Sequence, residues 1–198
     1  MTDLTPMRAL GAVAAETTPI GPYELRENTG LALASLACTD DVTPFGLALP
    51  GPGKMIQDTQ GRSAIWMGKG LWLIAAHDQA ESDFAQTLRQ DLGQKVDAKV
   101  TEQTDAWVAF EITAPSAQDI QAVLAHLVNL PNAATEPGCA ARTLVHHMSV
   151  FVLRPDNQQL TFLGLRSYAQ SLHDVLEETL RRRLRKQPSL SNTTTDQI

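Results

Sequence analysis

Apolar and polar residues follow a pattern that recurs three times along the chain: a strand-like segment, a polar joint, and then apolar residues at helical spacing. The first unit predicts a β-hairpin over residues 64–75, with Gly68-Lys69-Gly70 as its turn. Three apolar residues then share one helical face over 82–92, so we predict a helix there with Ser82 as its N-cap.

The second unit predicts a strand over 106–112 and a helix over 116–130, which begins after Pro115. Ahead of both units, residues 46–54 read GLALPGPGK, and their alternating prolines and glycines cannot continue a helix or a paired strand. This segment is therefore a predicted connector. The apolar residues at 30–37 fit a short strand or a helical turn equally well.

The third unit predicts strands over 144–153 and 160–165, joined by a turn at Pro155-Asp156-Asn157. A helix over 167–184 follows, and its apolar stripe is the clearest in the chain. Strand pairs interleaved with single helices are typical of an α+β protein, in which helices cover mostly antiparallel sheets. We therefore expect an α+β fold built of ferredoxin-like halves.

Length and composition fit one soluble globular domain or two small, tightly packed halves. With 198 residues, the chain buries roughly 70% of its surface on folding, which is enough for a single core. Residues 1–21 and the polar end of the chain lack sustained periodicity. We expect a disordered N-terminal segment over 1–21, a single domain over 22–184 and a flexible tail over 185–198.

The charge is divided between an acidic body and a basic end. The net charge is -6, but the run RRRLRK at 181–186 holds five of the 16 basic residues, so residues 1–180 carry 11 basic and 21 acidic residues, or -10. An acidic body argues against nucleic acid as a partner. The basic run complements the dipole at a helix end; binding to an acidic partner, to phosphate or to a membrane surface is the alternative.

Two further features concern location. No apolar run approaches the roughly 20 residues that a membrane-spanning helix needs, so we expect no membrane contact. Cys38 and Cys139 are too few for a disulfide framework, and the first twenty residues lack a secretory pattern. We therefore expect the protein in the cytoplasm.

Phosphate-binding motifs fail at defined positions. Around residues 51–54, a Walker loop would need Gly at position 48 and Ser or Thr at position 55, where Ala48 and Met55 stand. After Gly68-Lys69-Gly70, a dinucleotide fingerprint would need Gly at position 73, where Leu73 stands. The sequence predicts no nucleotide site.

Metal and nucleophile candidates are equally weak. If His146 and His147 lie in a strand, their side chains leave opposite faces and cannot share a metal ion. A zinc site that combined one of them with Cys139, His126 and His77 would need four elements to converge. We expect Cys139 to be a small buried thiol. The residues alone therefore identify no catalytic, cofactor-binding or metal site.

Four segments carry a family resemblance when they are taken in order. They are GRSAIWMGKGLWLI at 61–74, TDAWVAFEITAPSAQDI at 104–120, PGCAARTLVHHMSVFVL at 137–153 and LGLRSYAQSLHDVL at 163–176. The chain resembles the gamma subunit of bacterial heterotetrameric sarcosine oxidase over about residues 22–184. Its fold is then expected to be similar to part of the folate-dependent aminomethyltransferase of glycine cleavage.

The resemblance implies an accessory subunit without chemistry of its own. It implies alpha, beta and delta type partner subunits, which hold FAD, FMN, NAD, tetrahydrofolate and zinc, and no cofactor in this chain. Expected partner contacts are at Trp66, Trp72, Arg142, Arg166, Ser167 and Tyr168.

The chain departs from the family pattern at two places. Ala114 precedes Pro115 where the family has Gly, and residues 125–131 read AHLVNLP in place of Lys-Gly-Cys-Pro. The substrate of the complex therefore stays open among sarcosine, N-methylglutamate, dimethylglycine and N-methylproline. Two other functions are alternatives: a stand-alone folate-binding aminomethyltransferase-like protein, and an interaction module that acts through the basic helix end.

Overall fold

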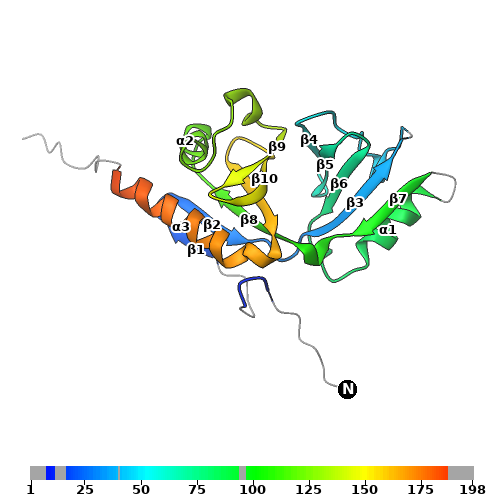
Figure 1. The fold of residues 1–198 in the computed structure, drawn as a ribbon, viewed down its shortest axis with the longest axis horizontal. Helices are drawn as coiled ribbons and strands as arrows, with labels where there is room; N and C mark the ends of the chain where they lie inside the picture. The colour runs from blue at the N-terminus through cyan, green and yellow to red at the C-terminus, as the bar shows by residue number, and fades with distance from the viewer. Residues whose placement is uncertain (1–7, 12–16, 40, 94–96, 187–198) are drawn as a thin grey trace, which may run out of the picture.

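The computed structural model describes residues 8–11, 17–39, 41–93 and 97–186. They form two antiparallel sheets and three α-helices (Figure 1). The six-stranded sheet has the order β1-β2-β8-β11-β10-β9. Its strands are β1 (Thr17–Ile20), β2 (Tyr23–Glu27), β8 (Trp107–Thr113), β9 (Cys139–Val145), β10 (Met148–Arg154) and β11 (Gln159–Leu165).

The five-stranded sheet has the order β4-β5-β6-β3-β7. Its strands are β3 (Ala32–Cys38), β4 (Met55–Gln57), β5 (Arg62–Gly68), β6 (Leu71–Ala76) and β7 (Ala98–Glu102). The helices are α1 (Phe84–Leu92), α2 (Ala117–Leu127) and α3 (Ala169–Lys186). Short 3₁₀ turns are η1 (Pro44–Gly46), η2 (Thr104–Ala106), η3 (Asn132–Ala134) and η4 (Arg166–Tyr168).

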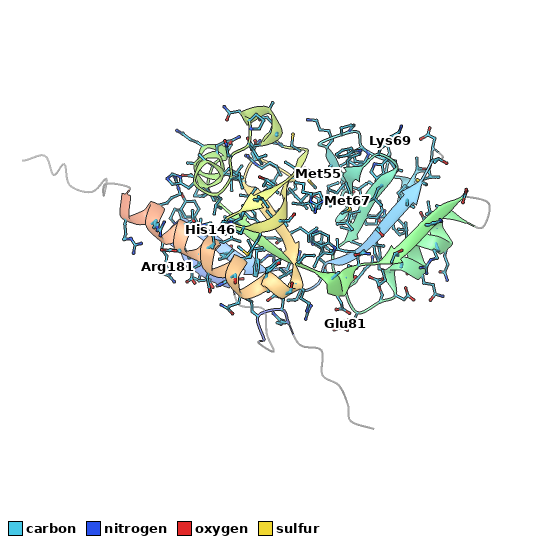
Figure 2. All side chains as sticks on the ribbon, viewed as in Figure 1. Met55, Met67, Lys69, Glu81, His146 and Arg181 are labelled. Carbon is cyan, nitrogen blue, oxygen red and sulfur yellow. The ribbon has the colours of Figure 1, made fainter. Side chains whose placement is uncertain are left out.

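The two sheets face each other, and the helices cover their outer faces (Figure 1). One core lies between the six-stranded sheet and α2 and α3, and a second lies between the five-stranded sheet and α1. A third core fills the space between the sheets. It includes Met55 and Met67 of the five-stranded sheet, which are labelled in Figure 2, and Phe151 and Leu163 of the six-stranded sheet. Both sheets are therefore buried over most of both faces.

This architecture confirms the predicted α+β class with antiparallel sheets. The open segment at 30–37 belongs to strand β3, and the predicted hairpin over 64–75 is β5 and β6, which meet at Lys69-Gly70. Each sheet contains a three-strand meander, β4-β5-β6 or β9-β10-β11, a simpler connectivity than the βαββαβ unit of a ferredoxin-like half.

The predicted strand over 144–153 is wrong, because it is divided by a turn. β9 ends at Val145 and β10 begins at Met148, so His146 and His147 form the two-residue loop of a hairpin. His146 has φ 53°, in the left-handed region that such hairpin loops require. Both histidines are exposed in this loop, so the condition that they lie in a strand is not met.

Two helix boundaries also differ from the prediction. Asp83, not Ser82, is the N-cap of α1, since its side chain accepts a hydrogen bond from Gln86 N while Ser82 Oγ donates to the carbonyl of Gln79. Ser116, the predicted first residue of α2, is its N-cap, and the helix ends at Leu127, before the predicted end at 130.

The ends of the domain extend beyond the predicted limits. Strand β1 lies inside the segment 1–21 that we expected to be disordered, and it pairs with β2, so that expectation is wrong for Thr17–Ile20. Helix α3 continues to Lys186, two residues into the predicted flexible tail. The rest of that tail, 187–198, lies outside the described residues.

Candidate partner interface

One end of the six-stranded sheet exposes a row of side chains on the face that points toward the other sheet. The register places Leu144 opposite Ser149 and Leu165 opposite Trp107, and continuation of the β10–β11 register sets Ser149 beside Leu165. Leu144 is 59% exposed and Leu165 39%. We call Leu144, Ser149, Leu165 and Trp107 the end row.

Phe151, in the next row inward, is buried and supports the end row. Phe151 is 3% exposed, and its ring meets Trp107 edge to face with 5.9 Å between the ring centroids. The guanidinium carbon of Arg142 lies 5.8 Å from the centroid of Phe151, and Arg142 Nε donates to Ser149 Oγ at 3.2 Å. Arg142 therefore lies along the sheet surface, held by a cation–π contact and a hydrogen bond.

Three further predicted interface residues follow the end row directly. Arg166, Ser167 and Tyr168 form η4 immediately after Leu165, at the start of α3. Tyr168 is 44% exposed. Arg166 Nη1 lies 4.0 Å from an Asp105 carboxylate that is fully exposed, a contact that contributes little stability.

The two predicted tryptophans lie elsewhere. Trp66 and Trp72 are cross-strand neighbours on the face of the five-stranded sheet that α1 covers, and Trp72 Nε1 donates to the carbonyl of Pro50 at 2.9 Å. The Trp72 side chain therefore anchors the connector. Arg142 thus lies beside the end row and Arg166, Ser167 and Tyr168 follow it directly, whereas Trp66 and Trp72 lie in the other sheet.

A polar cluster between the sheets was not predicted from the sequence. Glu111 is 2% exposed; its carboxylate accepts hydrogen bonds from Arg26 Nε and Asn28 Nδ2, both at 2.7 Å. Asn28 Nδ2 also lies 3.1 Å from His77 Nδ1. One signal was available: Glu111 is a charged residue in the middle of a strand, and both faces of that strand are buried. A buried charge needs polar partners.

This cluster borders a cavity that is too small for a cofactor. The cavity has a volume of about 30 Å³ and is lined by His77, Glu111 and apolar residues of both sheets, among them Leu33, Ile65 and Leu163. That volume holds about one water molecule, whereas small-molecule sites are typically ~300–1,000 Å³. The cluster therefore serves to join the two sheets.

The metal and thiol candidates are dispersed. His126 lies on α2, His77 lies in the polar cluster, and the described part of the chain contains no group of three residues that could hold a metal ion. Cys139 is 1% exposed, as expected of a buried thiol. Its Sγ donates to the carbonyl of Ala133 at 3.3 Å and accepts from Lys54 Nζ at 3.2 Å.

The basic run at the end of α3 is engaged within the fold. Arg181 and Arg182 pair with Glu177 and Glu178 one turn earlier, while Arg183 donates to Tyr23 Oη and to the carbonyl of Ala122, both at 3.1 Å. These contacts favour the structural interpretation of the run. Among the described residues, no helix has the length and apolar character needed to cross a membrane.

Comparison of the sequence with protein-family models and with curated proteins finds no match. Among solved structures, the fold matches a chain of the heterotetrameric sarcosine oxidase from Corynebacterium sp. U-96 in complex with pyrrole 2-carboxylate. The TM-score is 0.67 and the identity 20%, over 84% of this chain and 88% of that chain.

A second match is the glycine cleavage system aminomethyltransferase T from Bartonella henselae, with TM-score 0.55 and 15% identity over 76% of this chain. The match spans 44% of the aminomethyltransferase chain, less than half of its length. At these identities the comparisons describe the fold. The protein has an aminomethyltransferase-like fold and matches, over most of its length, a chain of heterotetrameric sarcosine oxidase.

Proposed function

We propose that this chain is an accessory, non-catalytic gamma-type subunit of a heterotetrameric sarcosine oxidase or of a related N-methyl amine demethylase. The observation that carries the proposal is the end row together with η4. All three exposed large hydrophobic side chains of the described residues, Leu144, Leu165 and Tyr168, belong to these two elements. Neighbouring exposed apolar side chains are typical of a protein–protein interface.

The composition of this surface fits a subunit contact. Interfaces are enriched in aromatic residues and arginine, and Trp107, Tyr168, Arg142 and Arg166 lie in or beside the end row. A permanent subunit contact commonly buries ~2,000 Å² or more, so we expect the interface to extend beyond these residues.

In this proposal the cofactors and the chemistry belong to the other subunits. In the proposed complex, alpha, beta and delta type subunits hold FAD, FMN, NAD, tetrahydrofolate and zinc, and carry out the oxidative demethylation in the cytoplasm. This chain supplies surface that supports their assembly. The cavity between its two sheets is too small for a folate or a flavin.

Co-expression tests the proposal. The tagged chain is produced together with the alpha, beta and delta type subunits from the same organism, and recovery of all four is measured after affinity purification. We expect Leu144→Asp and Tyr168→Ala each to lower recovery of the partners at least ~10-fold, because truncating an interface anchor typically costs more than ~1 kcal/mol. Gln90→Asp on the exposed face of α1 is the control and should leave recovery unchanged.

Two results would contradict the proposal. The first is a wild-type chain that never co-purifies with the other subunits. The second is a Tyr168→Ala complex that assembles normally yet loses turnover, since Tyr168 would then serve the chemistry.

A further inference from the structure

The two sheets have four edge strands, and three of them are protected in the ways that natural sheets use. Strand β1 is four residues long and contains Pro19, β4 has three residues, and β7 carries the exposed charged side chains of Lys99 and Glu102. Such features discourage another strand from pairing. The fourth edge, β9, differs from them.

Only the first part of β9 is covered. Ala140 N donates to the carbonyl of Gly53 at 3.0 Å, and Lys54 forms an isolated bridge with Cys139. From Ala141 to Val145, the described residues place no other strand on this side of β9. Five of the seven residues of β9 therefore lie along an open edge.

The hydrogen-bond alternation of antiparallel strands identifies the open groups. Since Ala140 N points away from β10, the N–H and C=O groups of Arg142 and Leu144 point away from it too. Those of Ala141 and Thr143 point toward β10. The open edge thus offers two donors and two acceptors at the spacing of a β-ladder.

The side chains of this edge do not prevent another strand from pairing with it. Arg142 carries the only formal charge of β9, and it lies over Phe151 instead of reaching outward past the edge. Within the described residues, its Nη1 and Nη2 atoms make no hydrogen bond, so they are available to a carboxylate. Leu144, on the same face, is the most exposed large hydrophobic residue described.

We propose that the Arg142–Leu144 edge takes up an extended segment of a partner subunit as an additional strand of the six-stranded sheet. The inference rests on the proposed function and specifies how the partner binds. Its segment bears a carboxylate side chain in register with Arg142 and an apolar side chain in register with Leu144, two residues apart on one face. The main-chain hydrogen bonds supply affinity, and these two side chains select the segment.

Residue-resolved hydrogen–deuterium exchange tests the proposal on the isolated chain and on the complex co-expressed with the alpha, beta and delta type subunits. In the isolated chain, we expect fast exchange of the Arg142 and Leu144 amides and slow exchange of the Ala141 and Thr143 amides. In the complex, the Arg142 and Leu144 amides should slow roughly 100-fold or more, because a paired strand amide exchanges only after opening.

A pair of variants separates the backbone from the side chain. Leu144→Ala removes the side chain and keeps the outward N–H, whereas Leu144→Pro removes that N–H as well. We expect the Pro variant to lose at least ~10-fold more partner recovery than the Ala variant, with circular dichroism of the isolated chain unchanged. If the Pro variant fails to fold, the exchange measurement on the wild-type protein still decides.

The outcomes are distinguishable. A complex that forms while both amides exchange as fast as in the isolated chain overturns the added strand and leaves the proposed function standing. Failure of any complex to form overturns both. An isolated chain that is dimeric, with both amides protected, shows that a second copy occupies the edge and overturns the proposal, as does a Pro variant that assembles as well as the Ala variant.

Discussion

Arg26 and Glu111 form an ion pair on the face of the six-stranded sheet that the five-stranded sheet covers. Arg26 Nη2 lies 2.5 Å from Glu111 Oε2, and the side chains are 51% and 2% exposed. The carboxylate is thus buried while its partner reaches solvent. A buried carboxylate needs such partners, because losing them leaves the full cost of its desolvation.

We expect Glu111→Gln to lower the free energy of unfolding by about 1–3 kcal/mol. In the wild-type protein one carboxylate oxygen accepts from Arg26 and the other from Asn28, whereas glutamine has an NH₂ group in place of one oxygen and would point it at one of these donors. Urea unfolding measures the change. Glu24→Gln, at an exposed position of β2, is the control and should change stability by less than about 0.5 kcal/mol. Equal effects of the two variants would show that the buried pair contributes nothing specific.

Glu102 makes stability depend on pH. Partial burial acts to raise the pKa of this carboxyl, but hydrogen bonds from Thr104 Oγ1 and from the amides of Ala85, Thr104 and Gln103 outweigh it, so the pKa lies below its ordinary value of 4.5. A lowered pKa stabilises the folded state above 4.5, and this stability is lost as the pH falls through the pKa of the folded protein.

The Glu102→Gln variant tests this dependence. At neutral pH we expect it to be less stable than the wild-type protein by about 1 kcal/mol, a value reduced for the solvent exposure of the side chain. The difference should shrink as the pH falls below 4.5. Thermal unfolding across this range measures it, and a difference that stays constant with pH would refute the assignment.

The buried guanidinium of Arg154 donates hydrogen bonds to three loop carbonyls. It is 2% exposed; Nη1 donates to Thr135 O at 2.8 Å, Nε to Asp156 O at 2.8 Å and Nη2 to Asn157 O at 3.1 Å. Burial lowers the pKa of Arg154, and the nearby carboxylates of Glu136 and Asp156 offset part of this effect. The contacts fix the loop before β9 and the turn after β10.

We expect Arg154→Lys to lower stability by about 2–4 kcal/mol, because one ammonium group cannot reach the three carbonyls that the guanidinium reaches. The shift of the urea midpoint measures it. Arg182→Lys, in an exposed pair on α3, is the matched control and should cost less than about 0.5 kcal/mol. An Arg154→Lys protein with the urea midpoint of the wild type would mean that the loops keep their conformation without the guanidinium.

Gly21 lies where the β1–β2 turn meets the end of α3. It has φ +62°, and an added Cβ would overlap the side chain of Leu184. We expect Gly21→Ala to lower the free energy of unfolding by about 1–2 kcal/mol, the cost of a left-handed backbone for a residue with a Cβ. Gly51→Ala, which has no heavy atom within 4 Å of the added Cβ, should be nearly neutral when thermal unfolding is compared.

Most elements of the fold could be predicted because their periodicity is local. The helix stripes and the hairpin over 64–75 needed only neighbouring residues. The turn at His146-His147 could not be predicted, since it contains no Gly, Asn or Asp and the apolar residues on either side read as one strand. Histidine does, however, adopt positive φ more often than most residues. Strand β1 shows no pattern of its own and depends on pairing with β2.

The candidate interface could be predicted only in part. Arg142 and Tyr168 were identified through a family resemblance, not through their local pattern. The end row joins the β9-β10-β11 meander to β8, a strand that lies far from the meander in the sequence, so Trp107 and Leu165 meet only in the folded sheet. Such a register follows from tertiary packing, which explains why Leu144 and the Glu111 cluster were missed.

The flavin content and amine turnover of the purified chain, alone and with its partner subunits, test the central proposal most directly. We predict that the chain alone is colourless and turns over no N-methyl amine. The complex recovered through its tag should contain flavin and demethylate its substrate. An isolated chain that holds one flavin per molecule, or that turns over an amine without partners, would contradict an accessory role.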